Sequence, residues 1–343
     1  MSVRTLVVDD SLTMQALIQR TLASDPDIQV VGTASSADEA RARIKELDPD
    51  VVTLDIEMPG MNGLDFLERL MRLRPTPVVM LSTLTSEGAD ASIAALELGA
   101  FECFDKLALR RPDEAIRLPA LVRAACGSRG RSVAAAPRSI APEPVHHADY
   151  VPRDQSMIAV GASTGGVEAL IELLSGFPAN CPPTVIVQHM PPSFTASFAA
   201  RLDRLCKPHV EEARAGAVLA PGKVYLAPGG DRHMEIAGPA TRRYCRLLTG
   251  PKASGHQPSV DVLFHSVARI AGADAVGAIL TGMGADGAEG MLAMRDAGAM
   301  TVGQDEASSV VYGMPAVAHR IGAVAQQMPL RRIAARLLQE CRA

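Results

Sequence analysis

The sequence predicts an α/β protein with two domains, each built on a mainly parallel sheet that helices wrap on both faces. Short apolar runs alternate with segments of helical spacing between residues 3 and 123, and the same alternation resumes at residue 156. Repeated strand–helix alternation is typical of parallel sheets. Aromatic residues make up only 3% of the chain. The cores must therefore consist of aliphatic side chains, which suits strands that are covered on both sides.

The domain organisation follows from where this alternation stops and starts again. The 343 residues are enough for two hydrophobic cores. We expect a first domain over residues 1–123, a linker over 124–154 and a second domain over 155–343. The linker is rich in Pro, Ser, Ala and Arg, as in "GSRGRSVAAAPRSIAPEP", a composition typical of a semi-stiff connection. In the second domain, antiparallel strands are expected around residues 209–248 beside the parallel sheet.

Composition and charge exclude several functional classes. The formal net charge of −4 carries no basic excess, which argues against a nucleic-acid surface. No apolar stretch is long enough to cross a bilayer, and the opening "MSVRTLVVDD" lacks the apolar core of a signal peptide. We therefore expect a cytoplasmic protein with neither a nucleic-acid partner nor a membrane-inserted segment.

Polar side chains stand at the predicted strand ends of the first domain. Asp9 and Asp10 end the first strand, Asp55 the third, Ser82 the fourth and Lys106 the fifth. These strand ends meet in one crevice of a parallel sheet. Because clustered carboxylates repel one another, they require a hard divalent cation, and their oxygen atoms are suitable ligands for Mg²⁺. A carboxylate beside Mg²⁺ can accept a phosphoryl group, whose oxygens a hydroxyl and an ammonium can then hold.

The stretches "VVDDS", "DIEMPGMNGLDFL", "PVVMLSTLT" and "LGAFECFDK" resemble a response-regulator receiver domain, whose fold is a flavodoxin-like (βα)5 sheet. The resemblance implies a histidine kinase of chemotaxis as phosphodonor. It assigns the phosphoacceptor to Asp55, the Mg²⁺ ligands to Asp10, Asp55 and the backbone carbonyl of Glu57 with Asp9 assisting, and the switch to Ser82 and Lys106. Two positions depart from the family pattern: Leu107 stands where receivers typically have proline, and Cys103 where they carry an aromatic switch residue.

The second domain opens on "IAVGASTGGVEAL", residues 158–170, which predicts a strand, a glycine-rich turn and a helix. Ser163 stands in the pattern G-x-S-x-G, which exposes a nucleophilic serine at a helix start. The same layout also suits a phosphate cradle. A phosphate loop, however, would have Lys before the Ser/Thr, and a dinucleotide site would have an acidic residue where the next strand ends in "VQHM". The pattern therefore favours the nucleophile.

A serine nucleophile needs a base within hydrogen-bond reach. His189 ends the strand "TVIVQH", so its ring should lie in the same crevice as Ser163. A third residue must orient the imidazole, and Asp286, Asp261 and Asp231 are the candidates. Asp286 follows the strand "AVGAIL" at the same sheet edge, although it could instead cap the helix after it. Asp261 is better suited to opening the helix "VDVLFHSVARI".

Several further blocks, "QHMPPSFTASFAARLD", "YLAPGGDRHM", "PSVDVLFHSVA" and "LTGMGADGAEGMLAM", together with the serine turn, resemble the chemotaxis protein-glutamate methylesterase family. The resemblance implies hydrolysis of glutamate γ-methyl esters on cytoplasmic chemoreceptor helices, deamidation of receptor glutamines, activation by phosphorylation of Asp55, and no cofactor for the ester step. It assigns the nucleophile, base and orienting carboxylate to Ser163, His189 and Asp286, and an oxyanion hole to the backbone N–H groups of Thr164, Gly165 and Met283.

Two other classes of function share part of this pattern. A response regulator with a DNA-binding output would need a compact helical module with a basic recognition helix, whereas this chain continues with glycine-rich α/β sequence. A nucleotide-binding switch would be revealed by binding of ATP or NAD, which we do not expect.

Overall fold

The computed structural model of the chain describes residues 2–83, 86–128 and 150–343. The chain divides into two compact units, Met1–Arg138 and Ser139–Ala343. Most of the expected linker, residues 129–149, lies outside the described residues, so its character and the domain boundaries stay predictions. Within the described residues, no helix combines the length and the apolar character needed to cross a membrane.

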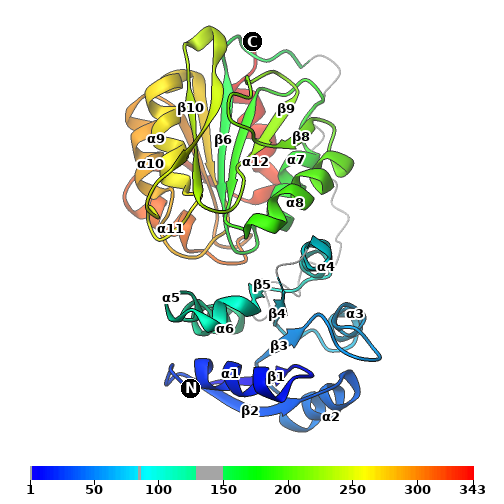
Figure 1. The fold of residues 1–343 in the computed structure, drawn as a ribbon. Coiled ribbons are helices and arrows are strands. Elements are labelled where there is room, and N and C mark those ends of the chain that lie inside the picture. Colours follow the sequence, from blue (N-terminus) through cyan, green and yellow to red (C-terminus); the bar gives the residue numbers. More distant parts are fainter. Residues whose placement is uncertain (1, 84–85, 129–149) are drawn as a thin grey trace. The chain divides into compact units, whose positions relative to one another are not determined.

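The first unit alternates strands and helices as predicted (Figure 1). Its elements are β1 (Val3–Val8), α1 (Leu12–Leu22), β2 (Ile28–Ala34), α2 (Ala37–Leu47), β3 (Val51–Asp55), α3 (Gly63–Leu73), β4 (Val78–Ser82), α4 (Ser86–Glu97), β5 (Glu102–Asp105), α5 (Pro112–Ala115) and α6 (Arg117–Gly127), with a 3₁₀ turn, η1 (Lys106–Arg110).

The five strands of this unit form one parallel sheet in the order β2-β1-β3-β4-β5. Every residue of β3 and β4 is buried, as expected of strands covered on both faces. The chain winds from β1 outward to both edges, so β1 and β3 flank the point where the strand order reverses. Ligands of such sheets bind at the carboxyl ends around that point.

The second unit contains the remaining described elements (Figure 1). They are β6 (Met157–Ala162), α7 (Gly166–Ser175), β7 (Thr184–Gln188), α8 (Pro192–Leu205), β8 (His209–Glu212), β9 (Lys223–Leu226), β10 (Arg232–Ala237), η3 (Ala240–Arg242), β11 (Tyr244–Thr249), α9 (Val260–Ala271), η4 (Gly272–Asp274), β12 (Ala275–Ile279), α10 (Ala288–Asp296), β13 (Met300–Gln304), α11 (Met314–Arg320), β14 (Gln326–Met328) and α12 (Leu330–Glu340).

Seven parallel strands in the order β14-β13-β12-β6-β7-β9-β8 form the main sheet of this unit. From β6 the chain proceeds to one edge through β7, and later to the other edge through β12. The strand order therefore reverses beside β6, which makes its carboxyl end the expected binding crevice. Within residues 209–248, β10 and β11 pair antiparallel and Val218 forms an isolated antiparallel bridge with Tyr244, whereas β8 and β9 extend the parallel sheet.

Helices cover both faces of this main sheet: α9 and α10 lie against one face, and α7 and α12 against the other (Figure 1). The apolar side chains of α9, Leu263, Phe264 and Val267, are fully buried. Its first turn begins at Ser259, whose side chain caps the helix by accepting a hydrogen bond from the backbone N–H of Val262. Packing and capping together fix the start of α9 close to the carboxyl end of β6.

Candidate active site

Three neighbouring strands bring the predicted catalytic residues to one edge of the sheet. Ser163 directly follows β6 and His189 directly follows β7, and these strands pair in parallel up to Ala162 and Gln188. The backbone N–H of His189 donates to the carbonyl of Ala162 over 3.1 Å. On the other side of β6, the backbone N–H of Ser163 donates to the carbonyl of Thr281 over 3.0 Å, just before the loop that carries Asp286.

Glycines make the sharp turn at Ser163 possible. Gly165 has φ +76°, which side chains other than glycine rarely adopt, and a Cβ there would lie 2.6 Å from Cβ of Val310. A Cβ on Gly282, in the neighbouring loop, would lie 2.3 Å from Sδ of Met314 and 2.8 Å from Cβ of Ser163. The serine is therefore packed into a space that only a glycine neighbour leaves open.

The side chains of His189 and Asp286 are joined by a hydrogen bond of 2.8 Å between Nε2 and Oδ2. Both side chains are almost entirely buried, with 6% and 0% of their surface exposed. Burial acts to raise the pKa of Asp286, but the hydrogen bond and attraction of His189, with hydrogen bonds from Ser259 and Asp261, lower it to about 2. Because an ionised carboxylate only accepts hydrogen bonds, Nε2 of His189 carries the proton.

Asp286 is held by the start of α9. Oδ1 accepts hydrogen bonds from Oγ of Ser259 over 2.7 Å and from the backbone N–H of Asp261 over 3.0 Å, and Oδ2 accepts from the backbone N–H of Val260 over 2.7 Å. The free N–H groups of a helix start stabilise a negative charge. Asp286 thus accepts at the start of α9, and the alternative that it caps its own helix α10 is not observed, since Gly287 is the N-cap there.

The other two carboxylate candidates make different contacts. Asp261 accepts hydrogen bonds from the backbone N–H of Gly290 and from Oγ of Ser254, each over 2.8 Å. Asp231 has 91% of its side chain exposed and lies 3.9 Å from Arg232. Of the three candidates, Asp286 alone forms the bond to His189.

The second ring nitrogen of His189, Nδ1, is buried and has no hydrogen-bond partner among the described residues. The seryl hydroxyl is therefore not bonded to it in this structure. Since Nε2 is protonated, Nδ1 carries the lone pair that a general base needs. Nε2 is thus hydrogen-bonded to Asp286, while Nδ1 is able to accept a proton, as a general base requires.

Candidate oxyanion donors lie around the serine turn. The backbone N–H of Ser163 is used by Thr281 and that of Gly166 by the carbonyl of Ser163. Oγ1 of Thr281 donates to the carbonyl of Thr164 over 2.9 Å, which fixes the peptide between Thr164 and Gly165. The assignment of the N–H groups of Thr164, Gly165 and Met283 stays a prediction.

Sequence reasoning missed three side chains that touch this group. Gln188 donates from Nε2 to the backbone carbonyls of Ser163, over 2.8 Å, and His189, over 3.2 Å. Ser259 holds Asp286, and the ring of His256 stacks on that of His189. Ser259 could have been found as the N-cap in "PSVDVL". No sequence pattern marks Gln188 or His256, because the contact of Gln188 with Ser163 and that of His256 with His189 depend on how the fold brings separate segments together.

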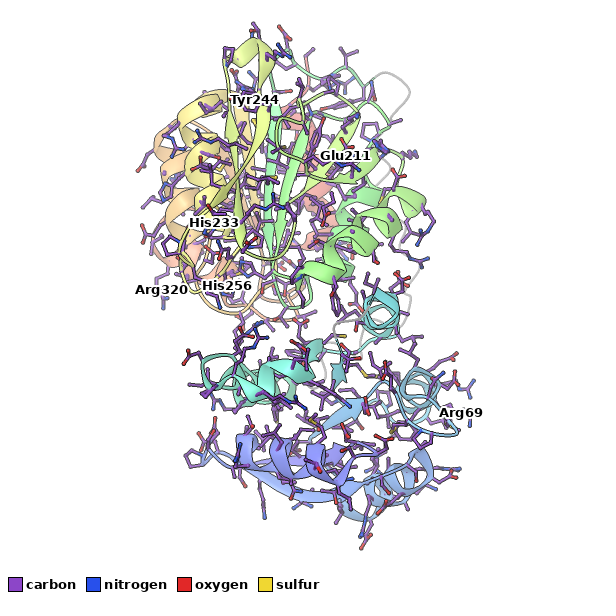
Figure 2. All side chains as sticks on the ribbon, in the orientation of Figure 1. Arg69, Glu211, His233, Tyr244, His256 and Arg320 are labelled. Carbon is purple, nitrogen blue, oxygen red and sulfur yellow. The ribbon has the colours of Figure 1, made fainter. Side chains whose placement is uncertain are left out.

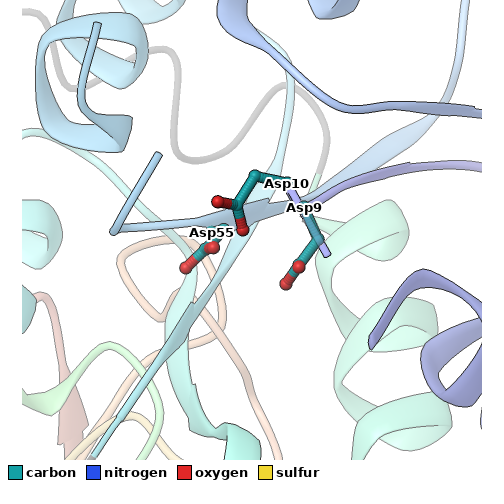
Figure 3. A group of neighbouring side chains, drawn as sticks. All are labelled: Asp9, Asp10 and Asp55. Atoms are coloured by element: carbon teal, nitrogen blue, oxygen red, sulfur yellow. The ribbon is translucent and has the colours of Figure 1, made fainter. Parts of the chain in front are cut away.

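In the first unit, the carboxylates of Asp9, Asp10 and Asp55 gather at the carboxyl ends of β1 and β3 (Figure 3). One oxygen of each lies within 4.8 Å of the others, and such a set of carboxylate oxygens suits a hard cation such as Mg²⁺. Nζ of Lys106 lies 2.7 Å from both Asp9 and Asp55. Burial raises the pKa of Asp55 to about 6, against the opposing effect of Lys106. The position of the Glu57 carbonyl as a ligand stays a prediction.

The predicted switch residues lie beside this cluster. Ser82 is buried at the end of β4, and Oγ of Ser92 in α4 lies 3.1 Å from its hydroxyl. Sγ of Cys103 contacts the backbone carbonyl of Ser92 over 3.4 Å, and burial raises the pKa of this thiol. Leu107, where receivers have proline, donates its backbone N–H to Oδ1 of Asp105 over 2.8 Å. The additional N–H is thus satisfied within the turn.

Comparison with known proteins identifies both units. The CheB methylesterase family matches residues 158–337, and the response regulator receiver domain matches residues 5–113. A protein-glutamate methylesterase/protein-glutamine glutaminase of Agrobacterium fabrum is 58% identical over 98% of this chain and 96% of its own length. One of the same name from Caulobacter vibrioides is 58% identical over 96% of this chain and 95% of its own.

A solved structure, the CheB methylesterase catalytic domain of Thermotoga maritima, is similar to the second unit. It covers 54% of this chain and 97% of its own, with 34% identity and a TM-score of 0.52. The two family matches occur in the same order in this chain, and the named relatives span nearly all of it. The chain therefore belongs to the CheB methylesterase family and carries a response regulator receiver domain in front of the catalytic one.

Proposed function

We propose that this chain is a chemotaxis adaptation enzyme that hydrolyses glutamate γ-methyl esters on the cytoplasmic helices of chemoreceptors, releasing glutamate and methanol, and that it also deamidates receptor glutamines. The pairing of His189 with Asp286, beside the turn that carries Ser163, is the observation that carries the proposal. The names of the relatives, which are 58% identical, support the same substrate class.

In the proposed reaction, Oγ of Ser163 attacks the ester carbonyl while Nδ1 of His189 accepts the hydroxyl proton. The negative charge on the carbonyl oxygen is held by backbone N–H groups of Thr164, Gly165 and Met283, each such donor contributing about 3 kcal/mol. His189 then gives the proton to the departing methoxy group, which leaves as methanol. A water molecule, deprotonated by the same nitrogen, hydrolyses the acyl-enzyme and restores the serine. Asp286 keeps His189 oriented and stabilises its charged form. The ester step needs no cofactor.

The same acyl chemistry accounts for deamidation. If the substrate side chain is glutamine, the leaving group is ammonia and the product is again glutamate. His189 must then protonate the leaving nitrogen, as the catalytic histidine does in serine hydrolases that cleave amides.

The receiver domain is proposed to regulate this reaction. Mg²⁺ would be held by Asp9, Asp10 and Asp55 with the carbonyl of Glu57, where it supplies charge neutralisation for phosphoryl transfer to Asp55. Lys106, which lies 2.7 Å from Asp55, and Ser82 would hold the phosphoryl oxygens. A histidine kinase of chemotaxis is the proposed phosphodonor, and phosphorylation of Asp55 is proposed to raise esterase activity.

Methanol release from membranes that carry a methylated chemoreceptor tests the proposal. We expect release by the full chain, an increase on addition of acetyl phosphate with Mg²⁺, and no such increase in Asp55→Asn. If methylated receptor is left intact by the phosphorylated chain, the proposed substrate is wrong. If acetyl phosphate changes nothing, the proposed regulation is wrong.

A further inference from the structure

A second imidazole lies against the proposed catalytic base. The rings of His189 and His256 are parallel, with centroids 3.8 Å apart and an angle of 3° between their planes. His256 belongs to the loop between β11 and α9, which is separate in sequence from the three residues assigned to the reaction. This contact therefore adds a residue to the site, and its interpretation rests on the function proposed above.

The loop that carries His256 is tied to itself and to its surroundings. Ala253 and His256 exchange two backbone hydrogen bonds, of 3.1 and 2.9 Å. Nε2 of Gln257 donates to the carbonyls of Gly250, over 2.9 Å, and Asp231, over 2.7 Å. The ring of His256 is thus presented by a fixed turn.

His233 of β10 fastens both ends of the same loop. Its Nδ1 accepts a hydrogen bond from the backbone N–H of Ser259 over 3.2 Å, and its Nε2 donates to the carbonyl of Pro251 over 2.9 Å. His233 is buried, and Figure 2 shows it at the same end of the unit as His256. The loop is therefore held at its entrance, at its exit and across its middle.

The catalytic imidazole needs a restraint of this kind. Its only hydrogen bond among the described residues runs from Nε2 to Asp286, and Nδ1 has no partner. A single bond in the ring plane fixes one atom of the ring but leaves the plane free to tilt about it. A parallel ring at 3.8 Å closes one face, so the ring plane, and with it the direction of the Nδ1 lone pair, is defined.

The contact also bears on charge. His189 becomes an imidazolium when it takes the proton of Ser163, and the face of an aromatic ring attracts a cation. A neutral His256 would therefore stabilise the imidazolium form of His189, which the reaction passes through.

We propose that His256 is a positioning residue, which stacks on His189 and holds its ring in the orientation for proton transfer with Ser163. In this proposal His256 takes no proton itself and acts through the base. The proposal predicts a loss in turnover number, with little change in substrate affinity, when the ring is removed.

Three variants of the full chain test it by methanol release from methylated chemoreceptor membranes. His256→Ala should lower kcat about 10- to 100-fold, the range expected when a reacting group is misaligned, and leave KM within about twofold. His256→Phe keeps a flat ring of similar size and should recover most of the lost turnover. His265→Ala, on the exposed side of α9, is the matched control and should behave as the parent chain does.

A spectroscopic readout accompanies the kinetics. In the parent chain the carbon-bound ring protons of His189 should be shifted upfield by the facing ring. The shift should persist in His256→Phe and vanish in His256→Ala. A side chain that only supports the fold would not give this pattern.

Several results would overturn the inference while leaving the proposed function intact. One is an unchanged kcat in His256→Ala under conditions in which Ser163→Ala is inactive. A rise in KM alone would make His256 a substrate contact. Equal damage from the alanine and phenylalanine variants would show that the ring face is not the cause. If instead the parent chain releases no methanol, the proposed function fails, and the ring shifts still report whether the stack exists.

Discussion

Nε2 of His189 lies 2.8 Å from Oδ2 of Asp286. This bond is one of four hydrogen bonds that the carboxylate of Asp286 accepts. Three of them come from residues 259–261 at the start of α9. The carboxylate of Asp286 thus connects His189, at the end of β7, to the N-terminus of α9, which is far away in sequence. It leaves Nδ1 without a hydrogen-bond partner among the described residues, as the proposed role of general base requires, and it singles out Asp286 as the proposed orienting carboxylate.

The first prediction concerns the choice between Asp286 and Asp261. Asp286→Asn should lower kcat for methanol release on the order of 10⁴-fold, because an amide favours the wrong imidazole tautomer. Asp261→Asn replaces a carboxylate that forms no hydrogen bond to His189 by an amide of the same shape. The loss of kcat in this variant should be at least 100-fold smaller than the loss in Asp286→Asn. An Asp261 variant as damaging as the Asp286 variant would show that the orienting carboxylate is misassigned.

The second prediction concerns Ser259, whose hydroxyl holds Oδ1 of Asp286 over 2.7 Å. Ser259→Ala should destabilise the second unit by about 1–3 kcal/mol, because it removes a hydrogen bond to a buried charge. It should also lower kcat about tenfold through a less well-oriented Asp286.

A matched control for Ser259 is Ser36→Ala, which removes the side-chain cap of α2 in the first unit. It should cost about 1 kcal/mol of stability there and leave basal methanol release unchanged. Equal loss of basal activity in the two variants would mean that capping, and not the contact with Asp286, explains the result.

The third prediction follows from the pKa of Asp55, which burial raises to about 6 although Lys106 opposes the rise. A carboxyl with a raised folded-state pKa contributes stability below its unfolded-state pKa of about 3.9, and that contribution is lost as the pH rises through 6. Asp55→Asn cannot ionise. We therefore expect it to be more stable than the parent above pH 6, by about 3 kcal/mol, and the gain to shrink between pH 6 and 4.

Hydrogen exchange of the β1 and β3 amides in the full chain measures this stability for the first unit alone. Asp27→Asn, on the exposed surface of the same unit, is the control and should follow the parent chain. A gain for Asp55→Asn that does not depend on pH would contradict the raised pKa.

The fourth prediction concerns removal of Mg²⁺. Excess EDTA should abolish phosphorylation of Asp55 by acetyl phosphate, because the carboxylates of Asp9, Asp10 and Asp55 then lack their counter-charge. Basal methanol release by the unphosphorylated chain should be unchanged, since the proposed ester step uses no metal. Mass spectrometry of the intact chain follows the phosphoryl group. Phosphorylation that persists in EDTA would count against the metal site, and lost basal release would count against a metal-free esterase.

The strand ends of both domains could be predicted because they follow directly from apolar runs. Asp55 ends β3 and His189 follows β7, as their neighbouring sequences indicate. In a parallel sheet, the end of a strand fixes the edge at which the next side chain lies. This is why single residues could be assigned to one site without knowledge of the whole fold.

What the sequence left open was decided by contacts between distant loops. Asp231, Asp261 and Asp286 are all candidates from the sequence, because the pairing with His189 depends on where α9 begins. The stack of His256 on His189 was not predicted at all. Nor was the parallel placement of β8 and β9 among the strands of residues 209–248, since strand direction depends on the path of the connection and not on the strand sequence.

Methanol release by Ser163→Ala, measured on methylated chemoreceptor membranes beside the parent chain, tests the central claim most directly. Ser175→Ala, at the end of α7 with its hydroxyl donating to the backbone carbonyl of Ile171, is the control and should keep full activity. Loss of the nucleophile should lower turnover on the order of 10⁴-fold or more, with the fold unchanged by circular dichroism. Turnover by the Ser163 variant close to that of the parent would contradict the account.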